Sequence, residues 1–290
     1  MTTRPGRIVD AHVHLWDPAR TDWYPYLGGG RDLGMGDVRG MARRFDAATY
    51  RAEAAGWNVV KVVNVAAATG SHSVDEAIEV DRAADASGDG LLAAVIGGLP
   101  PTESTAEAVA LIERQLTASR LRGVRPMSPR GPAVPGDDVL AALAERGLVF
   151  EVLTRPEGMT EAARRLAPHD GLTVVVEHVG WPSSDDPEQR AVWLEGLRAL
   201  ADAGPHVHCK LSGIAAAAGA LTAEAVRPWI EPAVEAFGIE RCFVASNFPV
   251  DGLHGTLDQL WSAYSEVTAG LSAADRDALF ATNAEALYRC

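Results

Sequence analysis

The sequence predicts a single (β/α)8 barrel, the TIM-barrel architecture, as the fold of residues 1–290. Eight short runs rich in Val, Ile and Leu recur along the chain, and most lack polar alternation. Such runs are typical of parallel strands buried on both faces. Ala- and Glu-rich stretches with helical periodicity separate them, as in a closed barrel of roughly 250 residues. The alternative is an open doubly wound sheet, which the absence of a Gly-x-Gly-x-x-Gly after the first strand disfavours.

The expected strands span 7–11, 58–65, 91–97, 121–125, 148–154, 172–178, 207–211 and 241–246. The expected helices span 42–55, 74–86, 105–119, 138–146, 159–166, 187–202 and 222–237. Asp137 and Thr222 are placed as N-caps, and Pro187 falls in a first turn. Glycines stand where three of the helices are expected to end: Gly56, Gly147 and Gly238.

Composition excludes several classes of partner. The formal charge of −13 and the pI near 5.0 argue against nucleic-acid backbones and anionic membrane surfaces. Residues 1–6 contain no apolar stretch of signal-peptide length, and the three widely spaced cysteines fit a reducing compartment. We therefore expect a cytoplasmic protein that acts on a small molecule. The sequence leaves open whether the protein forms a homo-oligomer.

Polar and ionisable residues cluster at the ends of the expected strands. Barrel enzymes build their sites there, at the C-terminal ends of the strands. All but the third strand end in such residues, and a core built only for packing would not distribute them in this way. They are His12, His14, Asn64, Arg125, Glu151, Thr154, His178, Lys210, Ser212 and Asn247.

His12 and His14 lie two apart on the first strand and therefore point to the same face. They can hold a divalent metal of the zinc type or polarise a substrate oxygen; hydrogen-bonded core histidines are the structural alternative. A catalytic zinc site normally has three protein ligands, and His178 can be the third. Asn247 at the last strand adds no negative charge, so any metal is expected to bind weakly.

Five motifs occur in an order that resembles the amidohydrolase-related (amidohydrolase 2) family. They are Asp-Ala-His-Val-His-Leu-Trp-Asp at 10–17, Arg-Gly-Val-Arg at 122–125, Glu-His-Val-Gly-Trp-Pro at 177–182, Lys-Leu-Ser-Gly at 210–213 and Ser-Asn-Phe-Pro-Val at 246–250. Within that family the chain is most similar to the sugar-lactone and pyrone-dicarboxylate lactone hydrolases. The resemblance implies a barrel hydrolase that opens a lactone or ester, in some members without a metal. Related members decarboxylate or hydrate instead.

The resemblance also bears on single residues. It points to Arg125 as an inward-facing fork for a substrate carboxylate or lactone oxygen, with a surface ion pair as the alternative. The family pattern has Asp at the last strand, where this chain has Asn247. An amide can orient a water or donate to a leaving oxygen, but it cannot serve as a general base.

Two carboxylates are candidates to replace that base. Glu151 is expected at the barrel mouth, where pairing with the buried Lys210 is the favoured role over catalysis. Lys210 in turn either forms that pair or contacts the substrate. Asp251 follows Asn247 by four residues and can turn into the site or cap the next helix.

The loop over residues 16–33 carries aromatic side chains beside a run of three glycines. We interpret it as a lid over a cyclic ligand, in which Trp16 and Tyr24 bind substrate; a packed surface loop is the alternative.

The sequence thus predicts a lactonase-like hydrolase acting on an anionic or oxygen-rich small molecule. His12, His14, His178 and Asn247 are the expected catalytic residues, and Arg125, Lys210 and Glu151 the expected substrate-binding ones. No cofactor is required, or one weakly held divalent metal. The alternatives are a lyase of the decarboxylase type in the same pocket and a catalytically silent, ligand-binding barrel.

Overall fold

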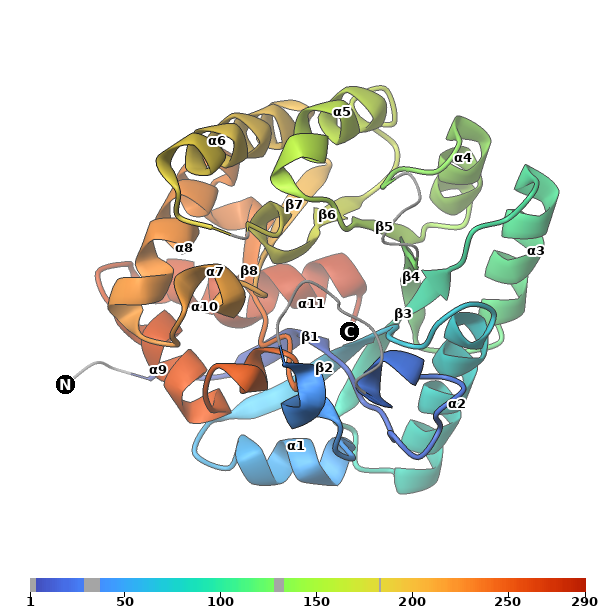
Figure 1. Ribbon diagram of the computed structural model, residues 1–290, viewed down its shortest axis with the longest axis horizontal. Coiled ribbons are helices and arrows are strands. Elements are labelled where there is room, and N and C mark those ends of the chain that lie inside the picture. The colour runs from blue at the N-terminus through green and yellow to red at the C-terminus, as the bar shows by residue number, and fades with distance from the viewer. Residues whose placement is uncertain (1–3, 29–36, 128–132, 183) are drawn as a thin grey trace.

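The computed structural model describes residues 4–28, 37–127, 133–182 and 184–290. Eight parallel strands pair in the order β1 to β8 and curve into a barrel with helices outside (Figure 1). The predicted barrel is therefore confirmed. The strands are β1 (Ile8–Val13), β2 (Val59–Val65), β3 (Leu92–Leu99), β4 (Leu121–Pro126), β5 (Val149–Val152), β6 (Val174–Val176), β7 (Val207–Leu211) and β8 (Cys242–Val244).

The segment after β8 closes the barrel against β1. The backbone N–H of Asn247 donates to the His12 carbonyl at 2.8 Å, and that of His14 donates to the Phe248 carbonyl at 2.8 Å. The β1–β2 pairing has a register shift between Asp10 and Val13. Each histidine therefore has a backbone hydrogen bond to the segment after β8.

The predicted helices are present with shifted ends. The helices of four or more residues are α1 (Ala47–Glu53), α2 (His72–Ser87), α3 (Thr105–Gln115), α4 (Asp137–Glu145), α5 (Pro156–Leu166), α6 (Pro187–Asp202), α7 (Ala215–Ala218), α8 (Ala223–Phe237), α9 (Leu257–Val267), α10 (Ala273–Asp277) and α11 (Asn283–Tyr288). Short 3-10 turns and a π-helical turn over Ala278–Thr282 complete the described part. Within it, no helix is long and apolar enough to cross a bilayer.

Local chemistry explains where the predictions hold and where they differ. Thr222 caps α8 as expected, because its side chain accepts the N–H of Ala225. Asp137 is the first residue of α4 and not its cap, which is Gly136. Residues 42–45 were expected to be helical, but Phe45 pairs in extended conformation with Trp16, so α1 begins after the cap Asp46.

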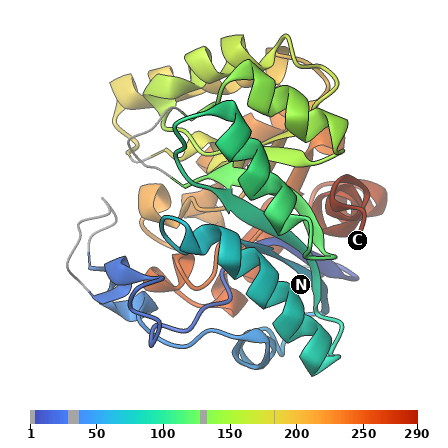
Figure 2. The ribbon, with the colours of Figure 1, turned by 90° about the vertical axis from the view of Figure 1, so that its right-hand side faces the viewer.

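Two apolar layers hold the barrel. The larger lies between the strands and the surrounding helices. The smaller fills the lower barrel interior, where Val9, Val63 and Phe243 pack with Tyr288 of α11. In Figure 2 the C-terminal helices (red) lie on the opposite side of the barrel from the loop that follows β1 (blue). α11 therefore closes one end of the barrel, and the loops at the other end are available to form a site.

Candidate active site

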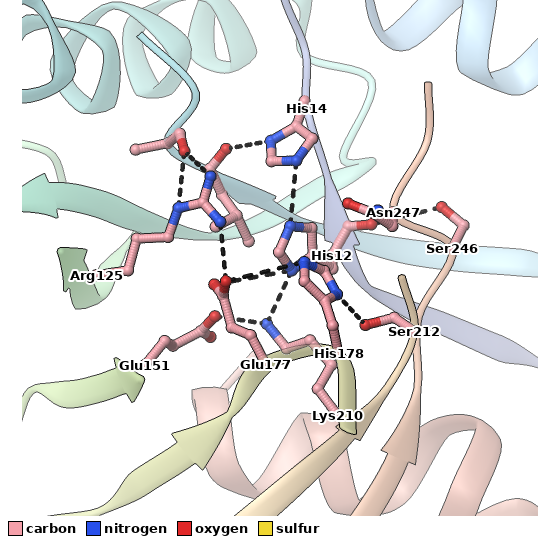
Figure 3. Close-up of polar contacts among 12 residues, drawn as sticks. His12, His14, Arg125, Glu151, Glu177, His178, Lys210, Ser212, Ser246 and Asn247 are labelled. Carbon is pink, nitrogen blue, oxygen red and sulfur yellow. Dashed lines mark hydrogen bonds and ion pairs between the residues drawn. The ribbon is translucent and has the colours of Figure 1, made fainter. Parts of the chain in front are cut away.

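A cavity of about 400 Å³ opens at the C-terminal ends of the strands. Its upper walls are largely apolar and include Trp16, Tyr26 and Trp181. Its polar floor brings together residues from four different strand ends: His14, Arg125, His178, Asn247 and Asp251. Figure 3 shows how most of these side chains converge on one another from around the barrel.

The remaining predicted residues lie beneath or beside this cavity. His12, Glu151 and Lys210 are completely buried below its floor. Tyr24 is also buried, and its hydroxyl donates to the Glu76 carboxylate at 2.9 Å in the wall behind the lid. Tyr26, two residues on, lines the cavity in the position expected of Tyr24. Residues 29–33 of the predicted lid lie outside the described residues.

The histidine pair of β1 forms a directed hydrogen-bonded chain. The Nε2 atoms of His12 and His14 are 3.2 Å apart. His14 Nδ1 lies 2.8 Å from the Val65 carbonyl, and His12 Nδ1 lies 3.4 Å from Lys210 Nζ. Burial is the main cause that lowers the pKa of both rings, that of His14 to about 3. Both imidazoles are therefore neutral near pH 7.

Glu177, which sequence reasoning did not single out, stands at the centre of the site. Its Oε2 accepts a hydrogen bond of 2.9 Å from Arg125, and its Oε1 is buried without a hydrogen-bond partner in the described structure. Burial raises its pKa, but Arg125, His178 and Lys210 outweigh burial and hold the pKa at about 2. The sequence feature that could have identified Glu177 is its position directly after three consecutive valines, at the end of a buried strand.

Arg125 is positioned as the resemblance implied. Its Nε and Nη2 donate to the Ala66 carbonyl at 2.9 and 2.5 Å, and Nη1 donates to Glu177. These bonds use three of the five N–H groups of a guanidinium, and no bond within the described ranges uses the other two. The side chain lines the cavity, so the free N–H groups are available to a ligand.

The expected pair of Glu151 and Lys210 is present. Lys210 Nζ lies 2.7 Å from Glu151 Oε2, and both side chains are fully buried. The Tyr288 hydroxyl donates to Glu151 Oε1 at 2.5 Å. Burial raises the pKa of Glu151 to about 7, against the lowering effect of Lys210.

A left-handed turn carries His178 into the cavity. Four consecutive residues, from His178 to Trp181, have φ between 45° and 79°, and three of them are not glycine. Such backbone is costly for L-residues and clusters at functional sites. His178 Nδ1 contacts the Ser212 hydroxyl at 2.8 Å, and Gly213 leaves room for the ring. Its Nε2 makes no hydrogen bond within the described structure and lies 3.9 Å from Glu177 Oε2, and the residue lines the cavity.

Asn247 and Asp251 form a second polar unit at the end of β8. Asn247 has φ +56°, and its Nδ2 donates to Asp251 Oδ1 at 2.9 Å. This bond uses one of the two N–H donors of Nδ2, so the amide oxygen and the second N–H are left for other partners. Asp251 Oδ2 has no hydrogen-bond partner in the described structure. Burial raises the pKa of Asp251 to about 7.

Three buried groups could hold a metal ion: His12, Glu177 and His178 offer ligand atoms within 4.8 Å of one another. Imidazole nitrogens and a carboxylate oxygen are ligand types that zinc accepts, and Glu177 Oε1 makes no hydrogen bond within the described residues. His14, which the sequence analysis gave as a ligand with His12 and His178, is not one of these three groups; its Nε2 lies 3.2 Å from His12 Nε2. Two neighbouring cations, Arg125 and Lys210, oppose a further positive charge here.

The barrel, the site at its C-terminal face and the five motifs define an amidohydrolase. A profile of the amidohydrolase family (amidohydrolase 2) matches residues 9–290, and the chain belongs to this family.

Named relatives share its full length at modest identity. An L-fucono-1,5-lactonase of Burkholderia multivorans is 28% identical, over 97% of this chain and 95% of that protein. An uncharacterised protein of Sinorhizobium fredii is also 28% identical, over 97% and 98%. A crystal structure of a B. multivorans amidohydrolase with bound zinc superposes with a TM-score of 0.82 at 26% identity, covering 98% and 99% of the two chains.

Proposed function

We propose that this protein hydrolyses a lactone or another cyclic ester of an oxygen-rich or anionic small molecule. One observation carries the proposal: a single cavity is lined by Arg125, His178 and Asp251. Two Arg125 N–H groups, His178 Nε2 and Asp251 Oδ2 make no hydrogen bond within the described part of the chain. Carbonyl hydrolysis needs both kinds of group, a donor for the oxyanion and an acceptor for the proton of water. The lactonase names of two relatives support the same substrate class.

The proposed reaction uses residues of this chain. A water molecule gives a proton to Asp251 while its oxygen adds to the substrate carbonyl. His178 Nε2–H and Arg125 donate to the oxyanion that develops. The ring C–O bond then breaks, and the ring oxygen takes the proton back from Asp251. Asn247 holds the carboxylate and presents its amide oxygen to the water.

The test is a proton-release screen of aldono-1,5-lactones, aromatic lactones and a cyclic dicarboxylate lactone. We expect hydrolysis of at least one, and a loss of about 10²–10³-fold in kcat for His178→Ala, because an oxyanion donor is removed. His169→Asn is the matched control, since this histidine lies after α5 and pairs with Asp137 away from the cavity. Failure of every lactone to release protons contradicts the proposal.

A lyase is the second candidate, because Asn247 replaces the carboxylate of the family pattern and a decarboxylase needs no base to activate water. Release of CO2 from hydroxybenzoate-type acids, without proton release from any lactone, would favour it. A catalytically silent barrel is the third. An Asn247→Asp variant that gains activity where the wild type has none would support that reading.

A further inference from the structure

The buried Lys210 lies at one end of a chain of hydrogen bonds that passes through both histidines of β1 (Figure 3). The chain runs from Lys210 Nζ to His12 Nδ1, from His12 Nε2 to His14 Nε2, and from His14 Nδ1 to the Val65 carbonyl. Each imidazole thus has one neighbour at each ring nitrogen. The chemistry of the two end groups determines where the protons lie.

A carbonyl oxygen only accepts hydrogen bonds, so His14 Nδ1 carries a proton and donates to Val65. In the neutral ring His14 Nε2 then holds a lone pair, and it accepts the proton of His12 Nε2 across 3.2 Å. His12 Nδ1 is therefore the bare nitrogen of its ring.

The other end of the chain requires the same arrangement independently. An ammonium group only donates, so His12 Nδ1 must accept from Lys210. Glu151 at 2.7 Å and the Tyr288 hydroxyl behind it keep the ammonium in place. Glu177 Oε1, the competing partner of His12 Nδ1, is 4.0 Å away and beyond hydrogen-bond distance.

We propose that Lys210 is a positioning residue that locks the tautomers of His12 and His14 and thereby closes the histidine pair to a metal ion. A metal at His12 Nε2 would have to displace the proton to Nδ1, where it would face the ammonium. A metal at His12 Nδ1 would have to displace the ammonium itself. Lys210 thus places a fixed positive charge beside the histidines. A divalent ion bound there would otherwise supply the positive charge.

Composition provides a separate indication that an ammonium is needed here. The chain contains 26 Lys and Arg residues, and only Lys61 and Lys210 are lysines. Lys61 of β2 is partly exposed and pairs with Glu285 of α11. A sequence that uses arginine almost everywhere has lysine at the one cationic position that is fully buried among the described residues. A compact ammonium with rotatable N–H groups can contact Glu151 and an imidazole at once. A guanidinium is larger and planar, and its N–H groups point in fixed directions, so it does not replace the ammonium at this position.

The inference is independent of the proposed hydrolysis, and its test uses no substrate. Imidazole ¹⁵N NMR of the wild type at neutral pH should show His12 protonated at Nε2 and bare at Nδ1, and His14 protonated at Nδ1 and bare at Nε2. A His12 ring protonated at Nδ1 in the wild type overturns the proposal, whatever the variants do.

Zinc affinity, measured by competition with a chromophoric chelator, is the second readout. The variant is Lys210→Met combined with Glu151→Gln, because Lys210→Met alone would leave a buried carboxylate without its cation. We expect the double variant to bind zinc at least about tenfold more tightly than the wild type, equivalent to roughly 1.4 kcal/mol. Lys61→Met is the matched control and should bind zinc as the wild type does. Equal affinity of wild type and double variant contradicts the proposal.

Discussion

At the residue scale, the mechanism depends on the pair at the end of β8. Asn247 cannot take a proton, but it holds Asp251, whose second oxygen has no partner in the described structure. Burial is the main cause that raises the pKa of Asp251 to about 7, and the nearby Asp10 carboxylate adds to it. The hydrogen bond from Asn247 and the nearby backbone amides of Gly213 and Ala215 lower this pKa. The Tyr264 phenol also lies within electrostatic range of this carboxylate.

These surroundings predict the pH dependence of hydrolysis. Only the ionised form of Asp251 can accept a proton, so kcat should fall as pH decreases through about 7 and level off above it. Asp251→Asn should lower kcat by about 10²–10⁴-fold and remove that limb of the profile. Steady-state rates between pH 5 and 9 measure both effects.

The control for this prediction is Asp37→Asn, which removes an exposed carboxylate that pairs with Arg39 away from the site. It should leave the rate and the profile unchanged. If Asp251→Asn keeps the acidic limb, another group supplies the base.

At the scale of elements, the left-handed turn after β6 and the glycine after β7 position His178 together. A Cβ at Gly213 would lie 2.4 Å from the His178 ring, and Gly213 has φ +62°. Trp181 ends the same turn at the rim of the cavity, where Arg155 stacks on it at 4.7 Å. The turn after β6 and the segment after β7 therefore have complementary shapes, although Gly213 lies 35 positions after His178 in the sequence.

Gly213→Ala tests this arrangement. The methyl group must push the His178 ring aside, and we expect a loss of about 10²-fold in kcat/KM. Gly219→Ala is the matched control, because Gly219 also has positive φ (+72°) but open space around it. Both substitutions should cost stability, about 1–2 kcal/mol for the backbone alone, whereas only Gly213→Ala should impair turnover. Equal activity of the two variants would contradict the positioning role.

At the scale of the whole molecule, the C-terminal helix connects the closed end of the barrel to the site. Tyr288 is fully buried among the residues of the lower interior, and its hydroxyl reaches Glu151 across 137 positions of sequence. Glu151 holds Lys210, which in turn contacts His12. The last helix therefore contributes to packing and to the polar network beneath the cavity at once.

Tyr288→Phe should lower the free energy of unfolding by about 1–3 kcal/mol, because Glu151 loses a buried hydrogen-bond donor. Urea denaturation measures the change. Tyr264→Phe is the matched control: this phenol is equally buried, and its oxygen has no hydrogen-bond partner in the described structure. Removal of the Tyr264 hydroxyl should leave the free energy of unfolding unchanged or raise it. A Tyr288→Phe variant as stable as the wild type would show that the bond to Glu151 contributes nothing.

The sequence by itself determined the barrel and the composition of its mouth. Buried apolar runs at regular spacing specify parallel strands, and parallel strands bring their C-terminal ends together. Arg125, His178 and Asn247 could therefore be assigned to one site before any contact was known. After β8 the sequence analysis expected a next helix but gave it no bounds. The last helix was not predicted, because Asn283–Tyr288 carries too few turns for a clear period.

Only the tertiary structure decided what these residues do to one another. It buried His12 and Lys210 beneath the floor, where no periodicity separates a mouth position from a layer below it. It also showed Glu177 at the centre of the charges and Tyr24 turned toward Glu76. The physical reason is that strand alternation fixes which face a side chain points to. Depth in the barrel and hydrogen-bond partners depend on register, bulges and left-handed turns, which are set by long-range packing.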